Sequence, residues 1–213
     1  VSVKMGHFYT ILGYETVPSP DNFLYSHAYS MQYGDPFTHT GCLAATEAGP
    51  VRLQAGLTRG WDNWENSNDD YGFLGGMSWT SNDERTSLAF ALHTGREEGV
   101  LSPATNSRTT YSIVFSHDFY GPWSCVLQHD LGIDRGVLQD GSDAKWYGMN
   151  MYLFRELTEQ WKFGYRFEWF RDNDGTRVID GQSADYYQMA WGLNYSPSDR
   201  LRVRPSIRWD WTG

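Results

Sequence analysis

The feature that most constrains this chain is a two-residue alternation of apolar and polar side chains. Within residues 160–170, every odd position is aromatic: Trp161, Phe163, Tyr165, Phe167 and Trp169. The even positions from 162 onward are mostly charged: Lys162, Gly164, Arg166 and Glu168. Successive side chains of a β-strand point to opposite faces of the sheet. This segment is therefore predicted to be a strand with one aromatic face and one charged face.

The same alternation recurs along the chain and predicts an all-β protein. In residues 200–211 the apolar face consists of Leu201, Val203, Pro205, Ile207, Trp209 and Trp211. Arginine dominates the other face, which consists of Arg200, Arg202, Arg204, Ser206, Arg208 and Asp210. Weaker copies of the pattern bring the expected strands to about eleven. They lie near residues 1–8, 38–46, 51–58, 71–80, 86–94, 109–118, 123–132, 147–153, 160–170, 185–195 and 200–211.

The connections between these strands alternate between short and long. Tight turns are expected at 47–50, 81–84, 120–122, 156–159 and 196–199. The long connections are 9–37, 60–70, 95–108, 133–144 and 171–183, and they hold most of the acidic residues. Sequential antiparallel strands place alternate connections on opposite rims, so this rhythm is typical of a barrel. The predicted fold is an antiparallel up-and-down transmembrane β-barrel with short periplasmic turns and long extracellular loops.

Composition is compatible with a membrane barrel. Of 213 residues, 40% are hydrophobic and 16% are aromatic, yet the mean hydropathy is −0.57. No apolar run approaches the ~20 residues of a spanning helix, whereas a barrel strand needs only about 9 to 11 residues. The net charge of −9 argues against nucleic acid as a partner. Because single-chain bacterial barrels have even strand numbers, the odd number predicts that residues 1–213 are a single domain belonging to a longer barrel.

Several stretches of sequence resemble a known family. They are GHFY at 6–9, PSPDNF at 18–23, YSH at 25–27, MQYG at 31–34, PFTHTG at 36–41, TRGWDNW at 58–64 and RFEWFRD at 166–172. These stretches are similar to the beta-barrel porin-2 (OmpL-like) family, and the resemblance covers nearly all of the chain. It implies a barrel fold, a pore function and a place in the cell outer membrane. It carries over no functional residues.

The charged face of the predicted strands is expected to line a water-filled lumen. The predicted pore-lining residues are Arg52, Gln54, Lys162, Arg166, Glu168, Arg202, Arg204, Arg208 and Asp210. The predicted lipid-facing residues are Leu53, Phe163, Tyr165, Phe167, Val203 and Ile207. A charged replacement of Tyr165 is expected to destabilise the barrel, whereas a small polar residue in place of Gly164 is expected to be tolerated. The alternative is that the charged face is the solvent face of a soluble sheet.

Two positions give more specific expectations. In residues 21–33, Asp21 is placed to be the N-cap and Gly34 the C-terminal stop of a short helix. This helix either folds into the barrel mouth and narrows it, or belongs to an ordinary surface loop. His129 falls on the lipid-facing side of its strand, so a bulge or a shifted register is considered there.

The cysteines and the acidic loop carry little functional signal. The alternation of faces along the strands places Cys42 on the lumen side and Cys125 on the outer side. This argues against a disulfide between them. A hard cation prefers clustered carboxylates, and one loop contains Asp62, Glu65, Asp69 and Asp70. The regular calcium-loop spacing is absent, so we expect a solvated acidic loop and no metal site.

The expected function is that of an outer-membrane porin for passive diffusion of small polar solutes and ions. Its expected partners are outer-membrane lipid and those solutes, and a homo-oligomer is left open. We expect no enzyme activity and no cofactor, because His117 and Asp118 point to opposite faces and cannot form a dyad. Arginines on a confined wall are screened less than exposed acidic loops, which predicts a modest anion preference. The alternative is a soluble, aromatic-rich β-sheet protein that binds carbohydrate and purifies without detergent.

Overall fold

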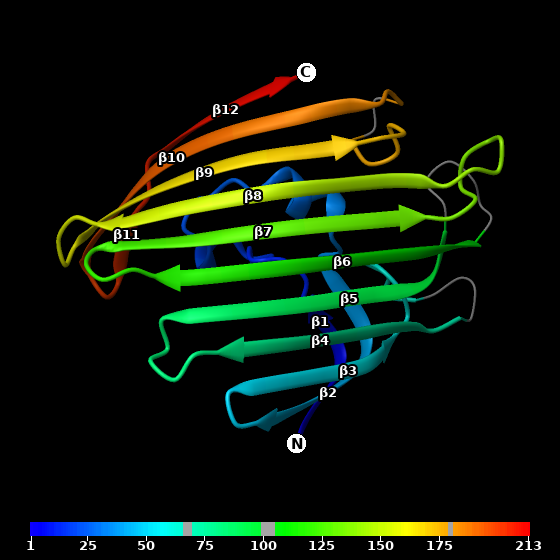
Figure 1. The fold of residues 1–213 in the computed structure, drawn as a ribbon, viewed down its shortest axis with the longest axis horizontal. Coiled ribbons are helices and arrows are strands. Elements are labelled where there is room, and N and C mark those ends of the chain that lie inside the picture. The colour runs from blue at the N-terminus through cyan, green and yellow to red at the C-terminus, as the bar shows by residue number, and fades with distance from the viewer. Residues whose placement is uncertain (66–69, 99–104, 179–180) are drawn as a thin grey trace.

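The computed structural model describes residues 1–65, 70–98, 105–178 and 181–213, which form one curved antiparallel sheet. Strands adjacent in sequence are adjacent in space, and β12 pairs with β10 beside β11 (Figure 1). The strands are β1 (Ser2–Tyr9), β2 (Thr38–Ala48), β3 (Val51–Thr58), β4 (Gly72–Thr80), β5 (Thr86–Glu98), β6 (Thr105–Asp118), β7 (Trp123–Asp134), β8 (Ala144–Glu156), β9 (Trp161–Asp172), β10 (Ala184–Ser198), β11 (Leu201–Val203) and β12 (Ser206–Thr212). The predicted all-β, up-and-down topology is confirmed.

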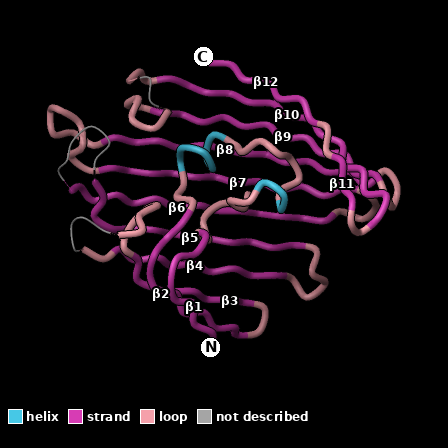
Figure 2. The backbone as a smooth tube through the Cα atoms, turned by 180° about the vertical axis from the view of Figure 1, so that it is seen from behind, coloured by secondary structure: helices cyan, strands magenta, loops and turns pink. Residues whose placement is uncertain are grey.

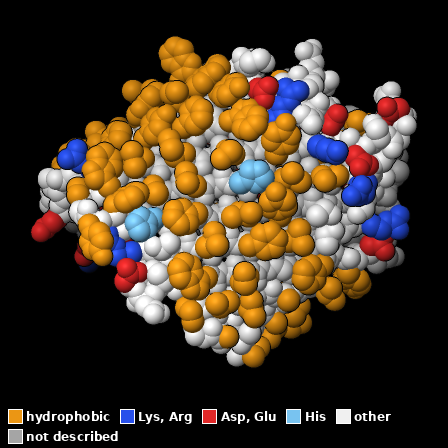
Figure 3. Space-filling model, in the orientation of Figure 1, with side chains coloured by type: hydrophobic (Ala, Val, Ile, Leu, Met, Phe, Trp, Pro, Cys, Tyr) orange, Lys and Arg blue, Asp and Glu red, His pale blue; other side chains and the backbone are white. Residues whose placement is uncertain are grey.

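The two faces of the sheet differ in polarity, as the alternation predicts. In β9, Arg166 and Glu168 are buried on the concave face, whereas Phe163, Tyr165 and Phe167 are half-exposed on the convex face. Figure 3 shows apolar side chains spread over the convex face, with charged groups mainly towards its margins. A sheet that is apolar outside and polar inside is the arrangement of a membrane barrel wall.

The sheet is open at β1 and β12, which lie at its opposite edges (Figure 1). Within the described residues, β1 pairs only with β2, and β12 pairs only with β10. The free backbone groups of such an edge need a partner strand if the sheet lies in lipid.

The strand expected over 200–211 is interrupted. Leu201–Val203 forms β11 and Ser206–Thr212 forms β12, and both pair with β10. Pro205 lies between them, and it has no backbone N–H to donate to the ladder. Its carbonyl still accepts a hydrogen bond from the backbone N–H of Leu193 at 3.0 Å. The alternation therefore continues through the break, and Ile207 remains on the convex face.

Three residues show how far the face occupied by a side chain could be predicted from its position in a strand. The placement of Cys42 on the lumen side was wrong: it pairs with Leu57, which is 58% exposed on the convex face. Cys125 lies on the convex face as predicted, and both cysteines are free. His129 is also on the convex face, stacked on Tyr111 with ring centroids 5.8 Å apart, and its ladders contain no bulge.

Among the described residues, the helical content is confined to two short turns between β1 and β2. These are the 3₁₀ turn η1 (Ser19–Asp21) and the π-helical turn η2 (Ser30–Gly34). The expected N-cap role of Asp21 is wrong, because Asp21 is the last residue of η1. Among the described residues, no helix has both the length and the apolar character needed to cross a membrane.

Candidate functional site

The main feature of the concave face is the long connection between β1 and β2. Residues 10–37, called the folded-in segment below, cross this face instead of extending away from the rim (Figure 2). Side chains from strands in the middle and at the C-terminal side of the sheet hold the segment by hydrogen bonds. Of the two alternatives for residues 21–33, the structure therefore shows the one that enters the concave side.

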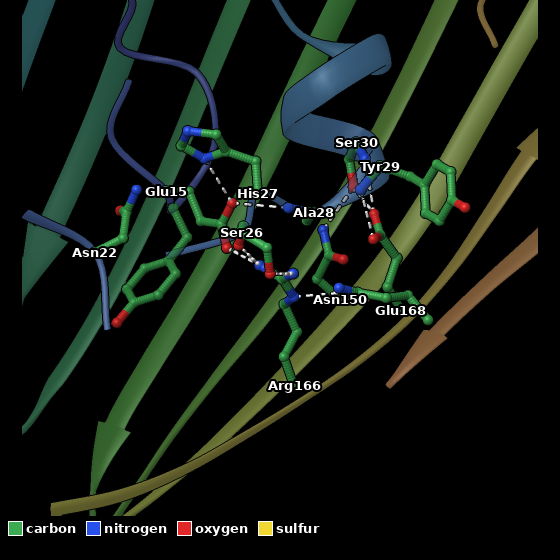
Figure 4. Close-up of polar contacts among 12 residues, drawn as sticks. Glu15, Asn22, Ser26, His27, Ala28, Tyr29, Ser30, Asn150, Arg166 and Glu168 are labelled. Atoms are coloured by element: carbon green, nitrogen blue, oxygen red, sulfur yellow. Dashed lines mark hydrogen bonds and ion pairs between the residues drawn. The ribbon is translucent and has the colours of Figure 1, made fainter. Parts of the chain in front are cut away.

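A buried ion pair joins the folded-in segment to β9 (Figure 4). The Arg166 guanidinium donates to the Glu15 carboxylate and, at 2.8 Å, to the Ser26 carbonyl. The other Glu15 oxygen lies 3.2 Å from His27 Nδ1 and accepts from the Ala28 N–H at 2.9 Å. Burial opposes ionisation, but Arg166 and the hydrogen bonds hold the pKa of Glu15 below its usual range. Glu15 is therefore an ionised anchor.

Glu168 lies two residues after Arg166 on β9 and binds the start of η2 (Figure 4). Its carboxylate accepts from the Tyr29 N–H at 2.6 Å and from the Ser30 N–H at 2.7 Å. The Ser30 hydroxyl also donates to Glu168 at 2.6 Å and accepts from Asn150 Nδ2 at 2.6 Å. A carboxylate at backbone N–H groups makes strong, charge-assisted bonds, so Glu168 fixes this turn against the wall.

Small residues of the wall make room for the segment. A Cβ added to Gly164 would lie 2.2 Å from the Phe23 ring, so only glycine fits beneath this ring. Phe23 also packs against Phe154, with ring centroids 5.1 Å apart. This close contact opposes the expectation that Gly164 tolerates a small polar side chain. An open lumen would have room for one, but the folded-in segment fills that space.

Aromatic and cationic groups fix the C-terminal part of the folded-in segment, near Tyr33 and Gly34. Trp146 Nε1 donates to the Gly34 carbonyl at 2.9 Å, and Arg177 Nε donates to the Tyr33 carbonyl at 2.7 Å. The Arg177 guanidinium also lies 4.6 Å from the Trp146 ring and 4.9 Å from the Trp61 ring. The cation–π contacts join the connection after β9 to β8 and to the connection after β3, and the two hydrogen bonds attach the folded-in segment to the same group.

Two arginines at the C-terminal edge hold the backbone of the segment. Arg204 NH1 donates to the carbonyls of Ser19 at 3.0 Å and Asn22 at 2.7 Å. Arg208 NH1 donates to the His27 carbonyl at 2.6 Å, and its Nε and NH2 bind the carboxylate of Asp210. Both arginines therefore anchor protein atoms and are not open cationic wall groups.

Asp35 is a buried carboxyl at the end of the segment. Among the described residues, neither of its oxygens has a hydrogen-bond partner. Burial and the nearby Asp130 carboxylate raise the pKa of Asp35 well above its ordinary value, although Arg177 opposes the shift.

A polar cavity of about 610 Å³ lies on the short-turn side of the folded-in segment. Tyr14 and Asn22 line it from the segment, and Lys162, Asn194 and Arg202 line it from the wall. Burial, Glu15 and Asp118 raise the pKa of Tyr14 to about 12, so its phenol stays neutral at physiological pH.

The predicted pore-lining residues occupy the concave side in different ways. Arg52 and Gln54 share the face of buried Thr58, and Arg52 pairs with Glu47 at 3.1 Å. Lys162 and Arg202 line the cavity. Arg166 and Glu168 are 0% exposed beneath the folded-in segment, and Arg204, Arg208 and Asp210 lie at its edge. The predicted lipid-facing residues are exposed or half-exposed on the convex face: Leu53, Phe163, Tyr165, Phe167, Val203 and Ile207.

The acidic loop after β3 has a structural role at one residue. Asp62 Oδ1 accepts from the N–H groups of Phe37 at 2.8 Å and Thr38 at 2.7 Å, where the folded-in segment enters β2. Asp69 lies outside the described residues. Within the described ranges, no group of three or more His, Cys, Asp or Glu side chains is arranged to hold a metal ion.

Sequence analysis missed the residues of the segment that bind the wall. Glu15, Ser30 and Trp146 each form a contact over more than a hundred residues of sequence. No spacing rule connects such positions. The usable signal was the presence of an acidic residue, Glu15, within a long, aromatic-rich connection that Pro18 and Pro20 make rigid.

A polar concave face, an apolar convex face and a connection that lies across the concave face are the arrangement of a membrane β-barrel wall. The sequence matches the family described as "Putative beta-barrel porin-2, OmpL-like" over residues 1–213. The chain belongs to this family, and it is an outer-membrane protein.

One solved structure with the same fold is the outer membrane channel DcaP of Acinetobacter baumannii, with a TM-score of 0.67 and 11% identity. The alignment covers 99% of this chain and 65% of the DcaP chain, so this chain spans less than two thirds of that length. A BenF-like porin from Pseudomonas fluorescens Pf-5 aligns with a TM-score of 0.28 and 13% identity over 99% of this chain and 74% of its own. That score is too low to carry an argument. No curated protein matches the sequence.

Proposed function

We propose that this chain forms part of a water-filled outer-membrane channel for passive diffusion of small polar solutes and ions. The observation that carries the proposal is the folded-in segment, which lies on the polar face of a sheet whose other face is apolar. A soluble carbohydrate-binding sheet would not require this separation of the two faces. Family membership and the apolar convex face therefore favour the channel over that alternative.

The folded-in segment is proposed to narrow the channel. It is held at Glu15, Ser30 and Gly34 by groups on different strands, which fixes both its depth and its course. A solute passing along the concave face must therefore pass the free side of this segment. We propose that the cavity beside Tyr14 lies on this route.

The open edges support a barrel made from more strands than those described. β12 carries polar side chains on one face and apolar side chains on the other, and β1 exposes Val3 and Met5 on the convex face. Because lipid offers no hydrogen-bond partners, we propose that further strands pair with these edges and close the barrel. Residues 1–213 are then one part of a single porin domain. A homo-oligomer stays a prediction, and chemical cross-linking of the full-length protein in membranes would test it.

Most arginines of the predicted basic strip are bound to protein groups, so fewer of them can set the ion preference. Arg166 is neutralised by Glu15, while Arg204 and Arg208 are bound to the segment. Arg202 and Lys162 remain as cationic groups that line the cavity. Any anion preference should therefore depend on Arg202 and Lys162, and the modest preference predicted for the whole basic strip should be smaller.

Conductance of the full-length protein in a planar lipid bilayer tests the proposal. We expect stepwise ion conductance, and a compact electrophoretic band that shifts on boiling. Deletion of residues 14–34, with a short flexible bridge, should increase the single-channel conductance. Purification as a soluble monomer without detergent, or the absence of conductance from folded protein, would contradict a channel. A deletion variant that folds with unchanged conductance would contradict the narrowing role alone.

A further inference from the structure

The cavity beside the folded-in segment brings together unpaired charges of both signs. Its volume of about 610 Å³ falls within the range of small-molecule sites. Carboxylates line it from Asp118 at the end of β6, from Glu156 at the end of β8 and from Glu159 in the following turn. Cationic groups line it from Lys162 on β9 and from Arg202 on β11.

The two signs are separated along the sheet. The acidic strands β6 and β8 come first in the strand order, and the basic strands β9 and β11 follow. Adjacent strands lie about 4.8 Å apart, so the backbone at Glu156 is one strand interval from its register partner Lys162 and three intervals, or roughly 14 Å, from that at Arg202. The side chains shorten this gap because both line the same cavity.

These charges are available to a bound solute. Among the described residues, Asp118, Glu156, Glu159 and Arg202 form no ion pair, and the ammonium of Lys162 lies over the Phe154 ring at 5.4 Å. Lys162 and Glu156 are register partners, yet they do not pair with each other. The cavity therefore presents carboxylates from β6, β8 and the following turn, and cationic groups from β9 and β11.

Further polar groups from β10 and from the folded-in segment complete the site. Asn194 is register partner to Lys162 on β10, is 8% exposed, and has no hydrogen-bond partner for its Oδ1 among the described residues. Asn194 Nδ2 donates to the Phe23 carbonyl at 3.3 Å, which fixes the amide under the segment. Tyr14 and Asp21 face the cavity from the segment and add a phenol and one further carboxylate.

We propose that this cavity is a binding subsite for short zwitterionic peptides, with the solute's ammonium towards Asp118 and Glu156 and its carboxylate towards Lys162 and Arg202. This inference deepens the proposed channel function and rests on it, because the solute reaches the cavity through the lumen. An extended chain advances about 3.5 Å per residue, so a peptide of two or three residues spans the separation between the two groups of charges.

Block of ion current by three matched probes tests the inference on the full-length protein in a bilayer. Triglycine carries both charges, N-acetyl-triglycine carries only the carboxylate, and triglycinamide carries only the ammonium. The half-blocking concentration of triglycine should be about three- to fivefold lower than that of either analogue, because each contact of an exposed charge contributes modestly. Equal block by all three probes in a conducting channel would overturn the subsite and leave the channel function standing.

Two double variants test which residues bind the carboxylate of the peptide and which bind its ammonium group. Lys162→Gln with Arg202→Gln should remove the advantage of triglycine over triglycinamide, and Asp118→Asn with Glu156→Gln should remove its advantage over N-acetyl-triglycine. Arg52→Gln changes a concave-face arginine that does not line this cavity and should leave all three probes unchanged. Discrimination that survives both paired variants would overturn the assignment.

A binding measurement separates the two proposals. Calorimetric titration of triglycine into the detergent-solubilised full-length protein does not depend on conductance. Binding that Lys162→Gln with Arg202→Gln weakens by about three- to fivefold would support the subsite even without conductance. Absence of binding to the folded protein would overturn it.

Discussion

The Glu15 carboxylate and the Arg166 guanidinium form a buried ion pair between residues that are 151 positions apart in the sequence. The side chain of Arg166 is 0% exposed and that of Glu15 is 4% exposed. Removing one partner of such a pair leaves an uncompensated buried charge, which is more costly than losing an exposed pair. This contact therefore determines how firmly the folded-in segment stays on the wall.

Glu15→Gln should loosen the folded-in segment. Arg166 would be left buried without its carboxylate, and breaking a buried pair costs about 3 to 5 kcal/mol. We expect a larger and noisier single-channel conductance and faster proteolysis within residues 10–37. Glu47→Gln is the matched control, because Glu47 and Arg52 form an exposed pair whose loss should cost about 0 to 1 kcal/mol. Equal effects of the two variants would contradict the anchoring role.

Asp35 should make the attachment of the folded-in segment to the concave face less stable as the pH rises. Its pKa in the folded protein is raised by burial and by Asp130, so the folded state holds a proton that the released segment loses. The contribution of Asp35 to the stability of the attached segment is therefore complete below the ordinary carboxyl pKa. It is lost as the pH rises through the raised pKa. Asp35→Asn removes this proton equilibrium and should flatten the pH profile of conductance. A profile that keeps its slope in the variant would contradict this origin.

Glu15 has the opposite pH dependence. Its pKa is lowered in the folded protein, so its contribution is complete above the ordinary carboxyl value and is lost as pH falls through the lowered value. Acid should therefore release the segment and raise the conductance, and Glu15→Gln should remove this acid response. The response of Asp35→Asn to acid should match that of the unmodified protein, which separates the two groups.

Gly164→Ala should disturb the segment more than its small volume suggests. The added Cβ would lie 2.2 Å from the Phe23 ring, so this ring must move away from Phe154. Overpacking of this kind typically costs about 1 to 3 kcal/mol. Thermal unfolding in detergent should show the loss, and Gly164→Ala with Phe23→Leu should recover part of it. If the single variant unfolds like the unmodified protein, the close contact is not important.

Tyr165→Lys tests the outer face at a neighbouring position. The Tyr165 side chain is half-exposed on the convex face and packs against Trp191, with ring centroids 5.7 Å apart. A lysine facing lipid near the bilayer midplane costs about 2 to 4 kcal/mol. Urea unfolding in lipid vesicles should show this loss, whereas unfolding of a Tyr165→Phe control should be nearly unchanged. Equal stability of both variants would contradict contact with lipid.

Strand phase could be predicted from the sequence wherever the two faces differ in polarity. In β9 the alternation of aromatic and charged residues is unbroken, and the predicted faces agree with the structure. In β2 it fails, because the concave face is apolar there: Leu43 packs with Leu12 of the segment, and Leu74 and Ala91 join them. Cys42 was therefore assigned to the wrong face. The polarity rule holds only where the concave face meets polar groups.

The candidate site depends on the course of the folded-in segment, which local patterns do not encode. Glu168 was predicted to face a lumen, and its face is correct, but its partners are the Tyr29 and Ser30 N–H groups. Contacts across more than a hundred residues depend on where a long connection lies in space. The break at Pro205 was missed, because residues 200–211 were expected to form one strand, although proline cannot donate to a strand ladder.

Arg202 and Arg204 should differ in their effects although they occupy the same face of one edge. Arg204 donates to the carbonyls of Ser19 and Asn22, whereas Arg202 lines the cavity and forms no ion pair among the described residues. Arg202→Gln should shift the reversal potential in a salt gradient towards cation preference, with little change in conductance. Arg204→Gln should change conductance and segment proteolysis, because two backbone carbonyls lose their donor. Bilayer recordings at two salt concentrations separate these effects, since screening weakens only the electrostatic effect. If both variants shift selectivity equally and leave the segment protected, Arg204 acts as a free wall charge and the anchoring interpretation is wrong.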